Sequence, residues 1–238
     1  MRGLFAAIGF LTRLPLPARA FDGTATPSAQ LAWYPVVGLL IGGLLWCLGW
    51  LLSGAPPLLA ASLLLLAWVA LTGALHLDGL ADSADAWVGG LGDRERTLAI
   101  MKDPRSGPIG VTAIVLVLLL KFATLASVPQ PSAMLWLAPL LGRAVLTAAF
   151  MCTPYVRSGG IGSGLVGESR SASVLALLLA VMVASFAGWH GLWTILATAL
   201  LFACWRWACL RRLGGMTGDT CGALTELVEA AVLVAWAL

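Results

Sequence analysis

Long apolar runs separated by short polar segments dominate the chain from residue 31 onward. Seven of these runs are long enough, or nearly so, to cross a bilayer as a helix of about 20 residues. They lie at 31–52, 57–76, 108–127, 132–152, 172–188, 190–209 and 219–238. Residues 3–14 form a shorter apolar stretch ended by Pro15, which predicts an interfacial or re-entrant helix. The pattern predicts an all-α polytopic membrane protein with about seven transmembrane helices, and a single domain spanning 1–238.

The composition supports the same class. Apolar residues make up 60% of the chain and charged residues only 11%, whereas soluble domains average about 25% charged residues. The eleven Trp residues suit anchoring at the membrane interface. A net charge of +3 is too small for a nucleic-acid footprint, so the expected partner is membrane lipid.

The positive charges are distributed unevenly among the connections between runs. They occur in the N-terminal segment and in alternate connections, at Arg2, Arg13, Arg19, Arg94, Arg96, Lys102, Arg105, Arg157, Arg170, Arg206, Arg211 and Arg212. The connections at 53–56, 128–131 and 188–191 contain no Lys, Arg, Asp or Glu. By the positive-inside rule, this asymmetry predicts a cytoplasmic N-terminus and one charged working face in the cytoplasm.

Three aspartates follow the second apolar run, at Asp78, Asp82 and Asp85. Spacings of four and three residues place all three carboxylates on one face of a helix. Because like charges repel, a divalent cation between them would stabilise the arrangement, and hard oxygen ligands favour Mg²⁺, with Mn²⁺ as a second choice. The segment therefore predicts a metal site of the kind that transfers phosphoryl groups. The alternative is a solvated acidic helix end.

A basic segment, MKDPRSGPIG at 101–110, leads into the third run. Lys102 and Arg105 supply positive charge for phosphate oxygens. Gly107 and Gly110, near a predicted helix start, could present backbone N–H groups to an anion. The alternative is ordinary flanking charge that sets the topology.

The last run carries carboxylates at unusual depth. Asp219 is expected to cap its start, whereas Glu226 and Glu229 lie two to three turns inside. Such groups need a proton, a cation or an arginine partner, and the candidate partners are Arg143 and Arg206. These arginines could equally be structural clasps.

Two further polar residues lie in or beside the apolar runs. His76 precedes Asp78 by two residues and could act as a base, a phosphate donor or a helix-end cap. Lys121 is expected to extend along its apolar stem toward the membrane surface.

Five elements resemble the cobalamin synthase (adenosylcobinamide-GDP ribazoletransferase) family. They are Phe10–Pro15 (FLTRLP, which contains Arg13), Tyr34–Gly38 (YPVVG), His76–Asp82 (HLDGLAD), Met101–Gly107 (MKDPRSG) and Thr217–Ala223 (TGDTCGA) with Glu226. They occur in family order over nearly the whole chain, and His76–Asp82 is the most specific.

The resemblance implies a magnesium-dependent transferase of the bacterial inner membrane. A ribose hydroxyl of alpha-ribazole, or of its 5′-phosphate, would attack the phosphorus next to the corrinoid aminopropanol of adenosylcobinamide-GDP, and GMP would leave. A homo-oligomer or association with other cobalamin-assembly enzymes is compatible with it. The sequence departs from the family at Pro104 and Ser106, which stiffen the basic segment without removing its charges. It also departs at Glu168–Arg170, which argues against a phosphate role for the 157–170 loop.

The candidate site residues follow from these patterns together. The catalytic candidates are Asp82, Asp219, Glu226 and His76; the phosphate-binding candidates are Lys102, Arg105, Arg13 and Arg143; the metal-binding candidates are Asp78, Asp82 and Asp85.

Two other functions share part of this pattern. A CDP-alcohol phosphatidyltransferase shares part of the Asp-Gly-x-x-Ala pattern, but it requires Arg after the Ala, where this chain has Asp82. A cation or corrinoid transporter could use the carboxylates as an ion path. Carboxylates gathered at one face, opposite uncharged connections, argue against a route through the membrane.

Overall fold

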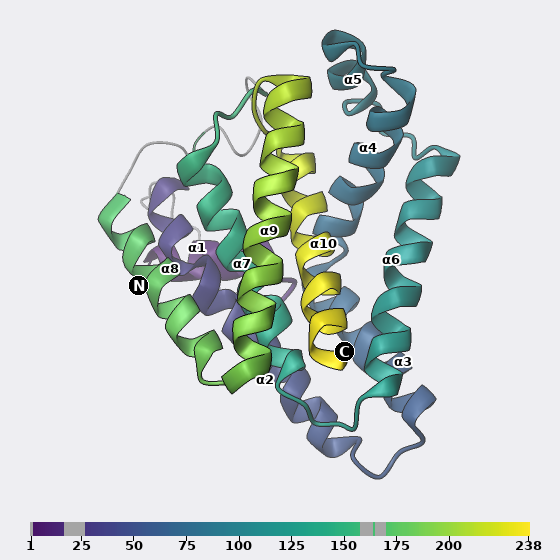
Figure 1. Cartoon of the computed structure of the whole chain (residues 1–238), viewed down its shortest axis with the longest axis vertical. Helices are drawn as coiled ribbons and strands as arrows, with labels where there is room; N and C mark the ends of the chain where they lie inside the picture. Colours follow the sequence, from purple (N-terminus) through teal and green to yellow (C-terminus); the bar gives the residue numbers. More distant parts are fainter. Residues whose placement is uncertain (1, 17–26, 158–163, 165–169) are drawn as a thin grey trace.

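The computed structural model describes residues 2–16, 27–157, 164 and 170–238, and these residues form a bundle of helices (Figure 1). The helices run in the order α1 (Arg2–Leu11), η2 (Pro27–Trp33), α2 (Tyr34–Leu51), α3 (Pro57–Thr72), α4 (Leu75–Gly89), α5 (Arg94–Ile100), α6 (Pro108–Ser127), α7 (Met134–Cys152), α8 (Arg170–Ser185), α9 (Gly188–Leu213) and α10 (Gly218–Ala237).

The predicted all-α, multi-pass architecture is confirmed, but the count of seven spans is not. Within the described ranges, five helices are long and apolar enough to cross a membrane: α2 with the end of η2, α6, α7, α9 and α10. The pair α3 and α4 makes a sixth if it counts as one bent span. α8 is also apolar, but at 16 residues it is shorter than these five helices.

The predicted span at 57–76 is wrong in form, because the helix breaks inside it. α3 ends at Thr72, and the chain turns by 87° before α4 begins. Gly73 and Ala74 at the break have φ values of 61° and 58°, which interrupts the helical hydrogen-bond ladder. The break directs α4 toward the charged end of the bundle and separates its aspartates from the apolar helix before it (Figure 1).

Two helices form the centre of the bundle. Most of α7 and α10 is buried, whereas α6 and α9 expose most of their apolar surface, as helices facing lipid do. α2 packs closely on α7: a Cβ added at Gly38 would lie 2.4 Å from the Pro139 carbonyl oxygen, and one at Gly42 would lie 2.4 Å from the Trp136 Cα. Glycine at these positions therefore permits backbone contact between the two helices.

The two ends of the bundle differ in charge, as the sequence predicts. The connections after α2, α6 and α8 lie together at the lower end in Figure 1 and carry no charged residue. The upper end holds α5, the end of α4 and the start of α6, and the basic segment joins α5 to α6 there. Arg19 lies outside the described residues.

Candidate active site

α4 carries the three aspartates, so the predicted helical arrangement of Asp78, Asp82 and Asp85 is confirmed. α4 packs directly on the start of α10. A Cβ at Gly79 would lie 2.7 Å from the Asp219 carbonyl oxygen. A Cβ at Gly222 would lie 3.3 Å from both the Cα and the carbonyl oxygen of His76. The small residues thus bring α4 and α10 close enough for their carboxylates to interact.

Asp82 lies at the centre of this group. Its half-buried carboxylate is close enough to Asp78, Asp219 and Asp85 to be repelled by their charges, and close enough to Arg157 to be attracted by its guanidinium. The repulsion is only partly offset by one arginine. A bound cation would relieve the remainder.

Asp219 forms an ion pair with Arg157. Arg157 Nη1 donates to Asp219 Oδ2 at 2.8 Å, and the Asp219 side chain is only 16% exposed. The prediction that Asp219 caps α10 is wrong, because Thr217 is the N-cap and accepts a hydrogen bond from the Thr220 amide at 3.2 Å. The Asp219 carboxylate therefore does not cap α10, and it faces the aspartates of α4.

Asp85 makes a different contact from its two neighbours. Its carboxylate accepts hydrogen bonds from the amides of Gly107 at 2.6 Å and Gly110 at 2.9 Å. A Cβ at either glycine would lie within 2.6 Å of that carboxylate. The N–H groups that we expected to hold an anion therefore hold Asp85, which caps the start of α6 from α4.

This contact predicts a stability effect. Asp85→Ala should lower the free energy of unfolding by about 1–2 kcal/mol, because two amides at the start of α6 lose their acceptor. Asp85→Asn keeps one acceptor oxygen and should lose less. Thermal unfolding in detergent measures both. An Asp85→Ala protein as stable as the parent, but unable to bind magnesium, would instead make Asp85 a metal ligand.

A metal could be held at this end without Asp85. Among the described residues, no three His, Cys, Asp or Glu side chains form a ready-made ligand group. The donors near Asp82 are nevertheless all hard carboxylate oxygens, as Mg²⁺ prefers. The repulsion among Asp78, Asp82 and Asp219 also favours a cation. The chemistry of these residues therefore fits magnesium.

The basic segment lies at the same end. Lys102 and Arg105 are exposed, and Arg105 forms a two-point ion pair with Asp103, at 2.9 Å from Nε to Oδ1 and 2.7 Å from Nη2 to Oδ2. The hydrogen bonds from the Arg105 side chain hold the pKa of Asp103 at about 2. This geometry presents a guanidinium in the planar orientation that also suits phosphate.

Arg13 and His76 border the break between α3 and α4. The Arg13 amide donates to the Leu71 carbonyl at 2.7 Å, and its side chain packs against Gly73 and remains exposed. His76, by contrast, is only 4% exposed in the first turn of α4, under Gly222. His76 thus lies next to the acidic group, on the side that faces the interior of the bundle.

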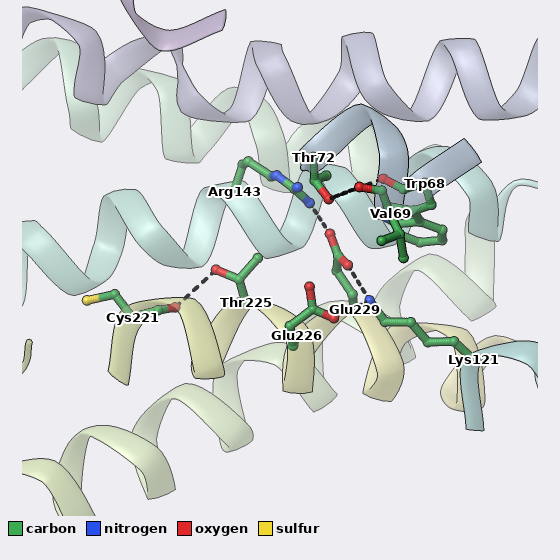
Figure 2. Close-up of polar contacts among 9 residues, drawn as sticks. All are labelled: Trp68, Val69, Thr72, Lys121, Arg143, Cys221, Thr225, Glu226 and Glu229. Atoms are coloured by element: carbon green, nitrogen blue, oxygen red, sulfur yellow. Dashed lines mark hydrogen bonds and ion pairs between the residues drawn. The ribbon is translucent and has the colours of Figure 1, made fainter. Parts of the chain in front are cut away.

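The remaining candidates lie deeper in the bundle (Figure 2). Arg143 is fully buried and pairs with Glu229, one of the two pairings the sequence suggests. Glu226 pairs with Lys121 at 2.6 Å. The expectation that Lys121 extends toward the membrane surface is wrong: it is 2% exposed and also contacts Glu229 at 2.5 Å.

The other proposed partner, Arg206, does not pair with either buried glutamate. Its guanidinium donates to the Cys152 carbonyl, at 3.0 Å from Nη2. It thereby ties α9 to the end of α7. Glu168, at the departure from the family pattern, lies outside the described residues.

The sequence did not predict the positions of two residues that the structure places in ion pairs with the candidate carboxylates. Arg157 contacts Asp219 because Tyr155 and Met216 form an isolated bridge that holds their segments together. No local pattern indicates this contact over 62 residues. For Lys121 a signal did exist, since one cation within an apolar run matches two carboxylates within another.

The fold and the site define a multi-pass membrane protein with a charged site at one end of its helix bundle. The family model for cobalamin-5-phosphate synthase matches residues 3–237. The chain therefore belongs to the cobalamin-5-phosphate synthase family, and it is a transferase.

Similar proteins from several bacteria cover the whole chain. The chain is 54% identical to an adenosylcobinamide-GDP ribazoletransferase of Stutzerimonas stutzeri, over 100% of this chain and 98% of that protein. It is 52% identical to a protein of that name from Pseudomonas fluorescens, over 100% of both chains. No solved structure matches it. The family assignment decides against the phosphatidyltransferase and transporter alternatives.

Proposed function

We propose that this protein joins alpha-ribazole, or its 5′-phosphate, to adenosylcobinamide-GDP, and that it requires magnesium. A ribose hydroxyl oxygen forms a new bond to the phosphorus next to the corrinoid aminopropanol. The phosphoanhydride bond to GMP breaks, and GMP leaves with the bonding electrons. The products are adenosylcobalamin, or its 5′-phosphate, and GMP. The names of the similar proteins support this reaction.

The acidic end of α4 and α10 supplies the residues for the metal. Asp82, Asp78 and Asp219 would hold magnesium, because their carboxylates repel one another and lie at the close contact between the two helices. A magnesium ion held there would supply neutralisation of charge on the diphosphate and on the leaving GMP. Asp85 supports this end by capping α6.

The basic segment holds the diphosphate. Lys102 and Arg105 are exposed at the same end of the bundle, and Arg105 can exchange the Asp103 carboxylate for phosphate oxygens in the same planar geometry. Arg13, exposed beside the α3–α4 break, is available to an incoming phosphate from the other side. Positioning and charge neutralisation are the main demands of phosphoryl transfer.

The proton of the attacking hydroxyl passes to a carboxylate of this group. Asp82 of α4 and Asp219 at the start of α10 are partly exposed, whereas His76 is buried and Glu226 is paired with Lys121. Because Asp219 is itself paired with Arg157, we assign proton acceptance to Asp82. His76 and Glu226 act from the buried side by supporting the helices that carry them.

The single observation that carries the proposal is the contact of α4 with α10, which brings together carboxylates from two of the family elements. The test is to incubate purified protein with adenosylcobinamide-GDP and either alpha-ribazole or its 5′-phosphate. We expect a corrinoid product carrying the lower nucleotide loop. Comparison of kcat/KM for the two acceptors identifies the preferred one, and no product with either acceptor would contradict the proposal.

We further propose that the protein lies in the bacterial inner membrane with this site facing the cytoplasm. A single cysteine at Gly54, in a background lacking the five native cysteines, should react with an impermeant thiol reagent applied to intact cells. One at Ser106 should react only after the membrane is opened. Labelling of Ser106 from outside would overturn the orientation.

A further inference from the structure

Four charged side chains are buried together within the bundle (Figure 2). Lys121 of α6, Arg143 of α7, and Glu226 and Glu229 of α10 are each no more than 5% exposed. Two carboxylates balance two cations, so the group is neutral when all four are ionised. Buried charges are costly unless every member is paired. The removal of one member therefore leaves an uncompensated charge.

Glu229 is the member that both cations share. Its Oε2 accepts from Lys121 Nζ at 2.5 Å, and its Oε1 accepts from Arg143 Nη1. Glu226 contacts only the lysine in this group, at 2.6 Å. A Cβ at Gly142 would lie 2.9 Å from Glu229 Cγ, so α7 and α10 approach closely at this level. Glu229 thus ties α10 to α6 and to α7 at once.

The same helix carries Asp219 at its other end. Ten residues separate Asp219 from Glu229, or about 15 Å along an α-helix. Between them, Gly222 packs on His76 of α4, and His76 also lies within electrostatic reach of Arg143. Because a packed helix moves as a unit, a shift or rotation of α10 at Glu229 would displace Asp219 from the aspartates of α4.

We propose that Glu229 is a positioning residue, which sets the depth and rotation of α10 and so keeps Asp219 beside Asp82. The inference rests on the proposed function, since it assigns Glu229 a part in the same site. Glu229 touches neither substrate nor metal in this role and acts through α10. The competing explanation is charge compensation alone, in which any neutral combination at these positions serves equally well.

Charge-balanced variants separate the two explanations. Glu229→Gln leaves two cations against one carboxylate and should lower the Tm in detergent. Arg143→Met combined with Glu229→Gln restores neutrality but removes the tie to α7. Glu229→Asp also stays neutral and shortens the shared side chain by one methylene. Thr225→Val is the matched control, because the Thr225 hydroxyl donates to the Cys221 carbonyl of its own helix at 3.1 Å.

We expect the two neutral variants to recover most of the parent's Tm without recovering its activity. In the double variant kcat should remain about 10- to 100-fold below the parent value, the scale of a misplaced catalytic group. KM for adenosylcobinamide-GDP should stay near the parent value. The rise in Tm caused by magnesium alone should shrink, and the control should keep parent values throughout.

Parent kcat and a full magnesium-dependent Tm shift in both neutral variants would overturn the proposal and leave charge compensation as the explanation. Failure of the proposed function gives a different result, because the parent itself would then form no corrinoid product. In that case the magnesium-dependent Tm shift still tests whether Glu229 positions Asp219.

Discussion

Asp82→Asn should lower kcat on the order of 10³-fold while the protein still inserts and folds, because it removes a charge that holds a cation. The substitution keeps the side chain's shape. It also removes repulsion from Asp78 and Asp219. The metal-free variant should therefore be as stable as the metal-free parent, or slightly more so.

Magnesium binding provides the second measurement on this variant. A ligand that binds only the native state at 100 times its Kd stabilises that state by about 2.7 kcal/mol. The magnesium-dependent rise in Tm should be present in the parent and smaller in Asp82→Asn. Glu95→Gln, an equal charge change on exposed α5, is the control. Full activity together with a full magnesium shift would show that Asp82 is not a ligand.

Lys102→Ala and Arg105→Ala should each lower kcat/KM by about 10²–10³-fold, the effect of removing one electrostatic stabiliser from a transition state. Contacts to phosphate are lost in both the ground state and the transition state. KM for adenosylcobinamide-GDP should therefore rise as kcat falls. KM for alpha-ribazole should change less. Steady-state kinetics with each substrate varied in turn measures these effects.

The matched control for these variants is Arg96→Ala, which removes an exposed cation from α5 at the same end of the bundle. It should leave both KM values near those of the parent. Asp103→Asn weakens the ion pair that orients Arg105 and should produce a partial loss only. If both alanine variants kept the kinetics of the parent, the basic segment would serve only to set the membrane topology and would not bind the diphosphate.

The sequence could predict the features that depend on local periodicity. The spacing of Asp78, Asp82 and Asp85 requires only that the segment be helical, and it is. The asymmetry of charge between the two ends follows from counting charged residues in each connection. The sequence names Arg143 and Arg206 as candidate partners for a buried carboxylate, because a charge within an apolar helix needs a partner, and Arg143 is the one that pairs.

The features that it could not predict depend on contacts between distant segments. The break before α4 places Ala74 at a positive φ, a conformation that is uncommon for alanine and that the sequence therefore does not predict. Asp85 follows the aspartate spacing yet caps α6, because the loop returns Gly107 to its carboxylate. Lys121 faces inward because α10 presents two glutamates to it; the charges of the two runs match in the sequence, but the packing of the two helices brings them together.

The most direct measurement of the central claim is the release of GMP from adenosylcobinamide-GDP by the purified protein, with alpha-ribazole and magnesium each present or absent. We predict rapid release only when both are present, with one corrinoid product formed for each GMP released. Chelation should stop the reaction, and added magnesium should restore it. GMP release at the same rate without alpha-ribazole, or product formation undiminished by chelation, would contradict magnesium-dependent ribazole transfer at this site.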